Sequence, residues 1–425
     1  MTLLTSLTRR KRALLARLGP GLITGAADDD PSGIATYSQA GARFGDAMLW
    51  TVVFTLPLMA AIQMVSARIG YVTGHGLTAA LKQHTPKPLW LGVVVMLVVA
   101  NTLNIGADIA AMAEALRLVL GGSAHVYAVT FGLLCVVLQV FLPYQRYVRW
   151  LKWLTLSLLS YVAVAFTLHV DWAHVLLHAL WPRLEFNREL LLTVVAVLGT
   201  TISPYLFFWQ AAQEMEDTRD THDRPGQPRS AAEVRWHLRR IKWDTIVGMT
   251  FSNGVAFFII LSSAVTLHAA GITDIETSAQ AAQALRPLGG EMAFVLFALG
   301  IIGTGLLAVP VLAGSAAYAV AEASGWQGSL SLRLDKGEGR GFYGVVAAAT
   351  LLGVALCFTP MDPMHELFWS AVLNGVIAVP IMALMMVLAG RRAVMGEHTI
   401  GRRLRALGWL ATAAMGAVVL ALFWS

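Results

Sequence analysis

Apolar runs of roughly 20 residues recur along the whole chain, and short polar connections separate them. A helix of that length crosses a hydrocarbon core about 30 Å thick. The strands of a transmembrane barrel would alternate every second residue and run for only about 10 residues, so the pattern excludes that class. We predict about eleven spanning helices, near residues 13–43, 46–70, 88–119, 123–143, 147–170, 188–212, 243–268, 289–322, 341–359, 363–390 and 403–424.

Two of these runs contain helix breakers. Pro31 follows three aspartates in the first run, and Pro204 lies in the sequence TTISPY of the sixth. Proline removes a backbone donor and clashes with the preceding turn. Two interrupted spans five spans apart are typical of two inverted five-helix repeats. The predicted parts are a basic N-terminus at 1–12, a first repeat at 13–170, a second repeat at 188–390 with a loop at 213–242, and a final helix at 403–425.

Composition and charge support a membrane protein. Hydrophobic residues make up 57% of the 425 residues and charged residues 13%, whereas soluble domains carry about 25% charged residues. The net charge of +6 does not indicate nucleic-acid binding, because the basic residues collect at span ends. Their bias predicts a cytoplasmic N-terminus and an external C-terminus in a prokaryotic inner membrane. Cys135 and Cys357 lie inside apolar runs and predict neither a disulfide nor a metal site.

The first break combines backbone and side-chain oxygens. Gly33 lets the chain leave helical geometry, and carbonyls freed there need a partner other than lipid. A carboxylate beside free carbonyls suits a divalent cation, and ionisable groups at membrane depth are usually functional. We expect Asp30 to be a ligand, with Asp28 and Asp29 setting a negative potential or contacting the water shell of the ion. The alternative is a proline kink whose acids face an aqueous vestibule.

The sixth break offers hydroxyls as well as carbonyls. Thr200, Thr201 and Ser203 precede Pro204, and unwinding there would free the Thr200 carbonyl. The alternative is that these hydroxyls bond within their own helix.

A polar stripe follows one face of the third span. Asn101, Asn104 and Asp108 recur at spacings of three and four, which indicates a face lined by water or ions or interhelical hydrogen bonds. Elsewhere, Gln210 and Glu214 could line an exit or form a solvated helix end, and the histidines show no ligand spacing. The remaining candidate is a single polar residue, Asn374, which we expect to serve packing.

The opening GPGLITGAADDDPSGIATYSQAGARFG resembles that of the natural resistance-associated macrophage protein (NRAMP) family of divalent metal transporters. Gly19-Pro20, Asp30-Pro31, Ala35-Thr36 and Gln39-Ala40-Gly41 match its pattern, and ADIAAMAEA in the third span matches at Asp108. The resemblance extends over nearly the whole chain and implies an all-α LeuT-type fold, with two inverted five-helix repeats and an eleventh helix.

The departures from the family pattern bear on the cargo. Gly33 and Ser203 stand where the family has an asparagine and a methionine ligand. Tyr205 replaces its proton-relay histidine, and Ala111 replaces a glutamate, which puts proton coupling in doubt. The loss of the soft thioether favours a hard cation, and Mg²⁺ keeps several waters when bound. The changes resemble the divergent NRAMP-related magnesium transporter branch.

We therefore expect a transporter and not an enzyme, importing Mg²⁺ or Mn²⁺ by alternating access. Asp30, the Thr200 carbonyl and Ser203 would hold the ion, and Gly33 would leave room for water. The alternatives are a proton-coupled Mn²⁺ or Fe²⁺ importer and a sodium-coupled carrier of an organic solute. An intramembrane enzyme or a receptor fits less well, because neither a catalytic set nor a large soluble domain is evident. The expected partners are the cation and the bilayer, with no resident cofactor, nucleic acid or obligate protein partner.

Overall fold

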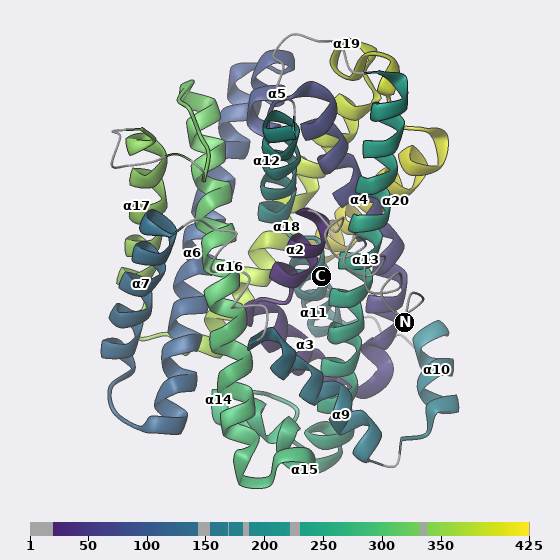
Figure 1. Cartoon of the computed structure of the whole chain (residues 1–425). Helices are drawn as coiled ribbons and strands as arrows, with labels where there is room; N and C mark the ends of the chain where they lie inside the picture. Colours follow the sequence, from purple (N-terminus) through teal and green to yellow (C-terminus); the bar gives the residue numbers. More distant parts are fainter. Residues whose placement is uncertain are drawn as a thin grey trace, which may run out of the picture.

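The computed structural model describes residues 20–142, 154–168, 170–181, 187–221, 230–330, 332 and 338–424. The ordered elements of these residues are all helices, most of them running along one common direction (Figure 1). The basic N-terminus predicted at 1–12 and the start of the first span lie outside the described residues.

The first half of the chain forms the spans expected there, displaced by a few residues at their ends. The fifth predicted span is described only from Leu154 onward, and its helix α9 is inclined at 117° to the next helix, α10. The elements are α2 (Pro20–Asp28), α3 (Pro31–Phe44), η1 (Gly45–Met48), α4 (Leu49–Thr73), α5 (Leu77–His84), α6 (Lys87–Leu120), α7 (Ala124–Phe141), η2 (Leu154–Leu158), α9 (Leu159–Thr167) and α10 (Trp172–Leu180).

The second half also follows the prediction, and the sixth span is broken in the predicted place. Short one-turn helices connect some of the spans. The helices are α11 (Arg188–Thr201), α12 (Pro204–Thr221), α13 (Ala231–Thr266), α14 (Ser278–Ala282), α15 (Arg286–Gly289), α16 (Ala293–Ser324), α17 (Arg340–Leu356), α18 (Pro363–Gly390), α19 (Arg392–Met395) and α20 (Arg402–Trp424).

The loop predicted at 213–242 is wrong in its extent. Helix α12 continues to Thr221, and α13 begins at Ala231 with Ser230 as its cap, so helix covers most of this range. The charged composition that indicated a loop instead serves contacts between helices. Arg240 of α13 forms ion pairs of 2.6 Å and 2.5 Å with two carboxylates of α12, those of Glu214 and Asp217.

Eight helical stretches of the described residues are long and apolar enough to cross a membrane. One of them, Pro31–Thr73, contains two predicted spans, because η1 joins α3 directly to α4. The inclined pair α9 and α10 would make a ninth, and α17, with 17 residues, is shorter than the rest. The lower count thus comes from one merged pair, one short helix and the inclined pair α9 and α10. Each predicted segment is helical where the structure describes it.

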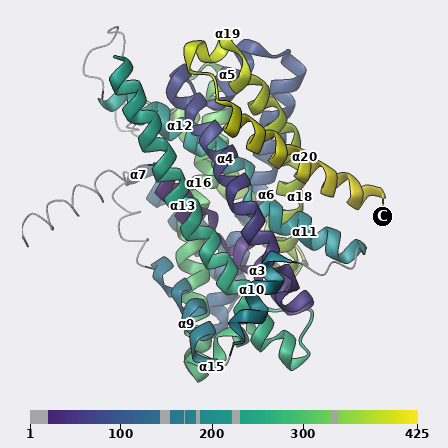
Figure 2. The same ribbon diagram turned by 90° about the vertical axis from the view of Figure 1, so that its right-hand side faces the viewer.

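The two broken spans lie inside the bundle, and each packs closely against a neighbouring helix. Helix α2 lies near the centre of the view in Figure 1, and α13 runs beside α4 in Figure 2. A Cβ on Gly25 of α2 would stand 2.3 Å from the Gly248 carbonyl oxygen of α13, and one on Gly199 of α11 would stand 2.0 Å from the Ala371 oxygen of α18. Small residues at such contacts let two backbones touch in a membrane. Both broken spans are therefore packed closely against the backbone of a neighbouring helix.

Candidate functional site

The break in the first span falls where the sequence predicts it. Helix α2 ends at Asp28 and α3 begins at Pro31, with Asp30 in extended geometry as the N-cap of α3. The Gly33 backbone N–H donates to Asp30 Oδ1 over 2.7 Å. Proline suits the first helical position, because its missing N–H would have no intrahelical partner there. The cap thus fixes one oxygen of the Asp30 carboxylate and leaves the other for contacts with neighbouring helices.

The break in the sixth span lies between Thr201 and Pro204. The Ser203 hydroxyl is 2.7 Å from the Thr200 carbonyl oxygen and 2.9 Å from that of Gly199. The Thr201 hydroxyl donates to the Val197 carbonyl oxygen over 2.6 Å. Both hydroxyls bond within their own helix, as the alternative interpretation expects.

The two breaks touch each other. The Tyr205 hydroxyl of α12 lies 2.9 Å from the Ala27 carbonyl oxygen and 3.2 Å from Asp30 Oδ2. A Cβ at Gly33 would stand 3.2 Å from Thr200 Oγ1, closer than an ordinary contact. The glycine therefore allows α3 to approach the end of α11 at this depth.

Helix α6 reaches the same carboxylate from another side. Asn104 Nδ2 donates to Asp30 Oδ2 over 3.1 Å, and Asn104 Oδ1 accepts the Ser370 hydroxyl of α18 over 2.7 Å. Asn101 instead donates to the Leu312 carbonyl and to Ser315 of α16. The residues of the polar stripe therefore have different contacts. Asn104 contacts Asp30 at the first break, whereas Asn101 joins α6 to α16, as the packing interpretation expects.

Asp108 is fully buried one turn beyond Asn104. The Ser32 backbone N–H is the polar group that approaches it. Neither of its carboxylate oxygens receives a hydrogen bond of normal geometry from the described residues. A buried acceptor without a partner is costly and requires an explanation. A cation held near the first break would compensate a negative charge at this position.

Asp28 and Asp29 have a different neighbour from Asp30. The Ser252 hydroxyl of α13 lies 2.5 Å from Asp28 Oδ2 and 3.1 Å from Asp29 Oδ1. Asp28 Oδ1 and Asp29 Oδ2 have no hydrogen-bond partner among the described residues. These two carboxylates thus lie against α13, whereas Asp30 contacts α6 and α12. The three aspartates therefore have different surroundings, and the division of roles among them stays a prediction.

The buried charge-bearing groups near the first break are carboxyl groups. Asp28, Asp29, Asp30 and Asp108 are each 0–2% exposed. The ion pairs found among the described residues all lie elsewhere. Burying a charge without compensation costs several kcal/mol, on the order of the stability of a domain. The arrangement therefore favours either protonated carboxyls or a bound cation.

Three other candidates show no hydrogen bond to the aspartates of the first break among the described residues. Gln210 donates to the Thr245 hydroxyl of α13 over 3.0 Å, and the fully buried Glu214 pairs with Arg240. These residues therefore connect α12 to α13, and the expectation of a solvated helix end is wrong for both. Asn374 is buried on α18, as a packing role requires.

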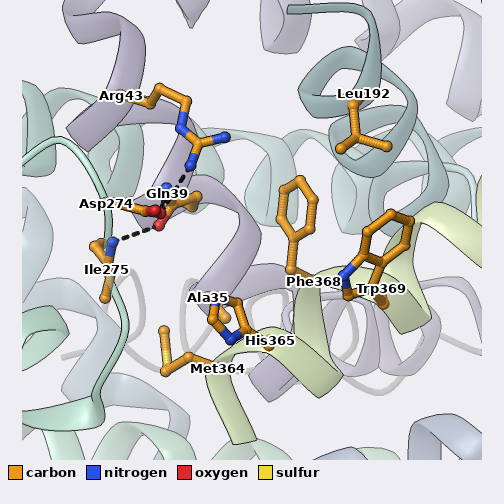
Figure 3. Close-up of a pocket in the computed structure, with 10 residues that line it drawn as sticks. All are labelled: Ala35, Gln39, Arg43, Leu192, Asp274, Ile275, Met364, His365, Phe368 and Trp369. Atoms are coloured by element: carbon orange, nitrogen blue, oxygen red, sulfur yellow. Dashed lines mark hydrogen bonds and ion pairs between the residues drawn. The ribbon is translucent and has the colours of Figure 1, made fainter. Parts of the chain in front are cut away.

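A hollow of about 180 Å³ opens along α3 beyond the break (Figure 3). In it Gln39 Nε2 and an Arg43 guanidinium nitrogen each lie 2.8 Å from Asp274 Oδ1, and Gln39 Oε1 accepts the Ile275 N–H over 2.9 Å. Sequence reasoning missed this contact, which we name the α3 latch (Gln39, Arg43, Asp274). Gln39 was the one sequence signal for this contact, because it matches the family pattern. Its partner Asp274, however, lies 235 residues away in the chain.

Comparisons with known proteins agree with this geometry. A family model described as natural resistance-associated macrophage protein-like matches residues 21–425. A protein of Aeromonas hydrophila named divalent metal cation transporter MntH is 28% identical over 408 residues, covering 93% of this chain and 92% of its own. One of the same name from Mycobacterium tuberculosis is 26% identical over 400 residues, covering 92% and 87%.

Solved structures share the fold at low identity. A manganese transporter of Eremococcus coleocola superposes with a TM-score of 0.75 at 17% identity, covering 96% of this chain and 86% of its own. Mhp1, a nucleobase-cation-symport-1 family transporter, gives a TM-score of 0.57 at 13% identity, covering 96% and 92%. The prediction of an all-α fold of the LeuT type, with broken first and sixth spans, is confirmed.

Proposed function

The chain belongs to the natural resistance-associated macrophage protein-like family, and from that premise we propose that it carries a divalent cation across the membrane by alternating access. The ion would bind between the two breaks, which transporters with discontinuous helices use near the midplane. The observation that carries the proposal is Asp30, a buried carboxylate that α6 and α12 both contact and that has no ion pair among the described residues.

The ligands would be oxygens of the two breaks. Asp30 Oδ2 is oriented by Asn104 and Tyr205. The Thr200 carbonyl has a second lone pair, and the Ser203 hydroxyl, after donating its proton, keeps lone pairs that can bind a cation. The room for water expected at Gly33 is not present in this conformation, because a Cβ there would stand 3.2 Å from Thr200 Oγ1. Asp108 would supply a second negative charge without direct contact.

The cation we propose is Mg²⁺. Oxygen donors and retained water suit this ion, and the break lacks the thioether that would favour a softer metal. The second candidate is Mn²⁺, which also accepts oxygen ligands. It is favoured by the similarity of the fold to that of the Eremococcus coleocola manganese transporter.

We infer import that is not coupled to protons. The family places a relay histidine where this chain has Tyr205, and a tyrosine keeps its proton at neutral pH. The membrane potential is sufficient to drive a divalent ion inward, because it contributes about 4.6 kcal/mol per 100 mV, twice the value for a single charge. The Lys/Arg bias predicts that the N-terminus lies in the cytoplasm, and inward transport means transport toward that side.

The test is cation influx into proteoliposomes that carry an internal pH dye. Mg²⁺ and Mn²⁺ are compared for the full chain and for Asp30→Asn, which removes the charge and keeps the shape. Glu114→Gln is the matched control, because Glu114 lies on α6 and pairs with the exposed Arg117 nearby. We expect Mg²⁺ influx without acidification, lost in Asp30→Asn and kept in the control.

Two outcomes decide between the candidates. Mn²⁺ influx with acidification and without Mg²⁺ influx would establish the proton-coupled Mn²⁺ importer. If neither metal enters, competition by organic solutes in a sodium gradient tests the remaining alternative, and the divalent-cation proposal is abandoned.

A further inference from the structure

Three potential metal ligands converge at the end of the molecule where α3 ends. Asp46 lies in η1, the turn between α3 and α4, and His174 and His178 lie on α10 (Figure 1). The Nδ1 atoms of the two histidines are each 3.1 Å from the same oxygen, Asp46 Oδ2. The expectation that no histidines show ligand spacing is therefore wrong, since HVLLH places two of them at i and i+4 on one helical face.

The two separations between histidine and aspartate are close to those around a small tetrahedral ion. One ligand atom from each of the three residues lies within 4.8 Å of the others. Two donors about 2.1 Å from a tetrahedral zinc ion stand about 3.4 Å apart. The observed 3.1 Å separations need to widen by only a few tenths of an ångström to admit the ion. The two imidazole rings are already side by side, with centroids 4.0 Å apart.

The cluster is accessible to a dissolved cation. The side chains of His174, Asp46 and His178 are 55%, 25% and 18% exposed. They adjoin a hollow of about 240 Å³ that Asp46 and His174 line together with His268. The His268 ring is fixed by a contact of 2.8 Å between Nδ1 and the Ala42 carbonyl oxygen. The hollow leaves room for a water as fourth ligand.

The donor set selects a class of cation different from the one proposed for the break. Imidazole suits Zn²⁺, Cu²⁺ and Ni²⁺, whereas oxygen donors suit Mg²⁺ and Mn²⁺. The two places are also far apart, because the 14 residues of α3 separate Asp30 from η1 by roughly 20 Å. An ion at Asp46 would therefore not compete directly with one at Asp30.

We propose that Asp46, His174 and His178 form a second metal site, which binds Zn²⁺ or a similar borderline transition-metal ion and fastens α10 to the turn between α3 and α4. The inference does not rest on the proposed transport function. Without metal, the three side chains form the histidine–carboxylate hydrogen bonds that the structure shows.

The test measures Zn²⁺ binding to the purified full-length protein by equilibrium dialysis, with excess Mg²⁺ present to occupy oxygen-only sites. We expect His174→Ala to lose one equivalent of bound Zn²⁺ relative to the wild type. His398→Ala is the matched control, since His398 is an exposed histidine of a different connection. Asp30→Asn should retain that equivalent, which separates this result from any failure of the transport proposal.

X-ray absorption at the zinc edge of the wild-type protein gives a second readout that needs no variant. We expect scattering from two imidazoles together with oxygen ligands. An all-oxygen shell would overturn the proposal, as would equal Zn²⁺ stoichiometry in the wild type and His174→Ala. Loss of the same equivalent in His398→Ala would overturn it too.

Discussion

Removing the charge of Asp108 should change metal affinity and metal-free stability in opposite directions. Asp108 is fully buried, its carboxylate oxygens have no normal hydrogen bond from the described residues, and it makes no ion pair among them. In Asp108→Asn the shape remains and the charge is lost. The metal-free protein should become more stable, because an uncompensated buried charge costs more than a buried amide.

The size of the effect on binding follows from the position of Asp108. It lies one turn beyond Asn104, whose amide contacts Asp30, so roughly 10 Å separate it from an ion at Asp30. A single negative charge 10 Å from a divalent ion contributes about 0.8 kcal/mol at the dielectric constant of water and about 3.3 kcal/mol at a dielectric constant near 20. Metal affinity should fall by a factor of roughly 4 to 300.

The assay is calorimetric metal binding and thermal melting on the same detergent-solubilised samples. We expect weaker binding and a metal-free melting temperature raised by a few degrees. Glu114→Gln on the same helix should leave both unchanged within error, since its partner Arg117 is exposed and such pairs contribute about 0–1 kcal/mol. The reasoning fails if Asp108→Asn binds metal as well as the wild type, or if it melts at a lower temperature without metal.

Three further predictions concern the contacts around the breaks. Gly33→Ala should slow ion flux and destabilise the protein by about 1–3 kcal/mol, because its Cβ would stand only 3.2 Å from Thr200 Oγ1. Flux and melting measurements test this. The control is Gly92→Ala, whose Cβ meets nothing within 4 Å. Tyr205→Phe removes a hydroxyl that contacts Asp30 and should lower the melting temperature by an amount equivalent to about 1.5–3 kcal/mol. Asp274→Asn should weaken the α3 latch and speed labelling of a cysteine placed in the hollow of Figure 3.

The sequence predicts features that depend on local chemistry. Pro31 and Pro204 break their helices where they stand, because proline cannot continue the backbone hydrogen bonds. The spacing of Asn104 on α6 correctly indicates a polar face, and the structure turns that residue toward Asp30. These signals act within a few residues, so one sequence is enough to interpret them.

Partners that are distant in the chain could not be predicted. Ser252 contacts Asp28 and Asp29 across more than 220 residues, and a lone serine in an apolar run carries no signal for that pairing. The loop predicted at 213–242 is wrong for a related reason. Arg240 pairs with Glu214 and Asp217 between α12 and α13, so a composition typical of a loop is compatible with helix.

The two halves of the first span are held at their outer ends by one long helix and the segment that follows it. At the start of α2, the Gly21 N–H donates to the buried carboxylate of Asp244 in α13 over 2.7 Å. At the end of α3, the latch partner Asp274 follows α13 and is 54% exposed. An exposed pair contributes about 0–1 kcal/mol, whereas a buried hydrogen bond to a charged group contributes about 1.5–3 kcal/mol.

This asymmetry bears on how alternating access would proceed. The two contacts do not share a side chain, so one can break while the other remains. Since the contact at the α3 end is the weaker one, the metal-free carrier should open first along α3, into the hollow of Figure 3. A cation can favour the opposite opening only by the difference between its affinities for the two states. The buried aspartates around the first break provide the negative charge on which such a difference would depend.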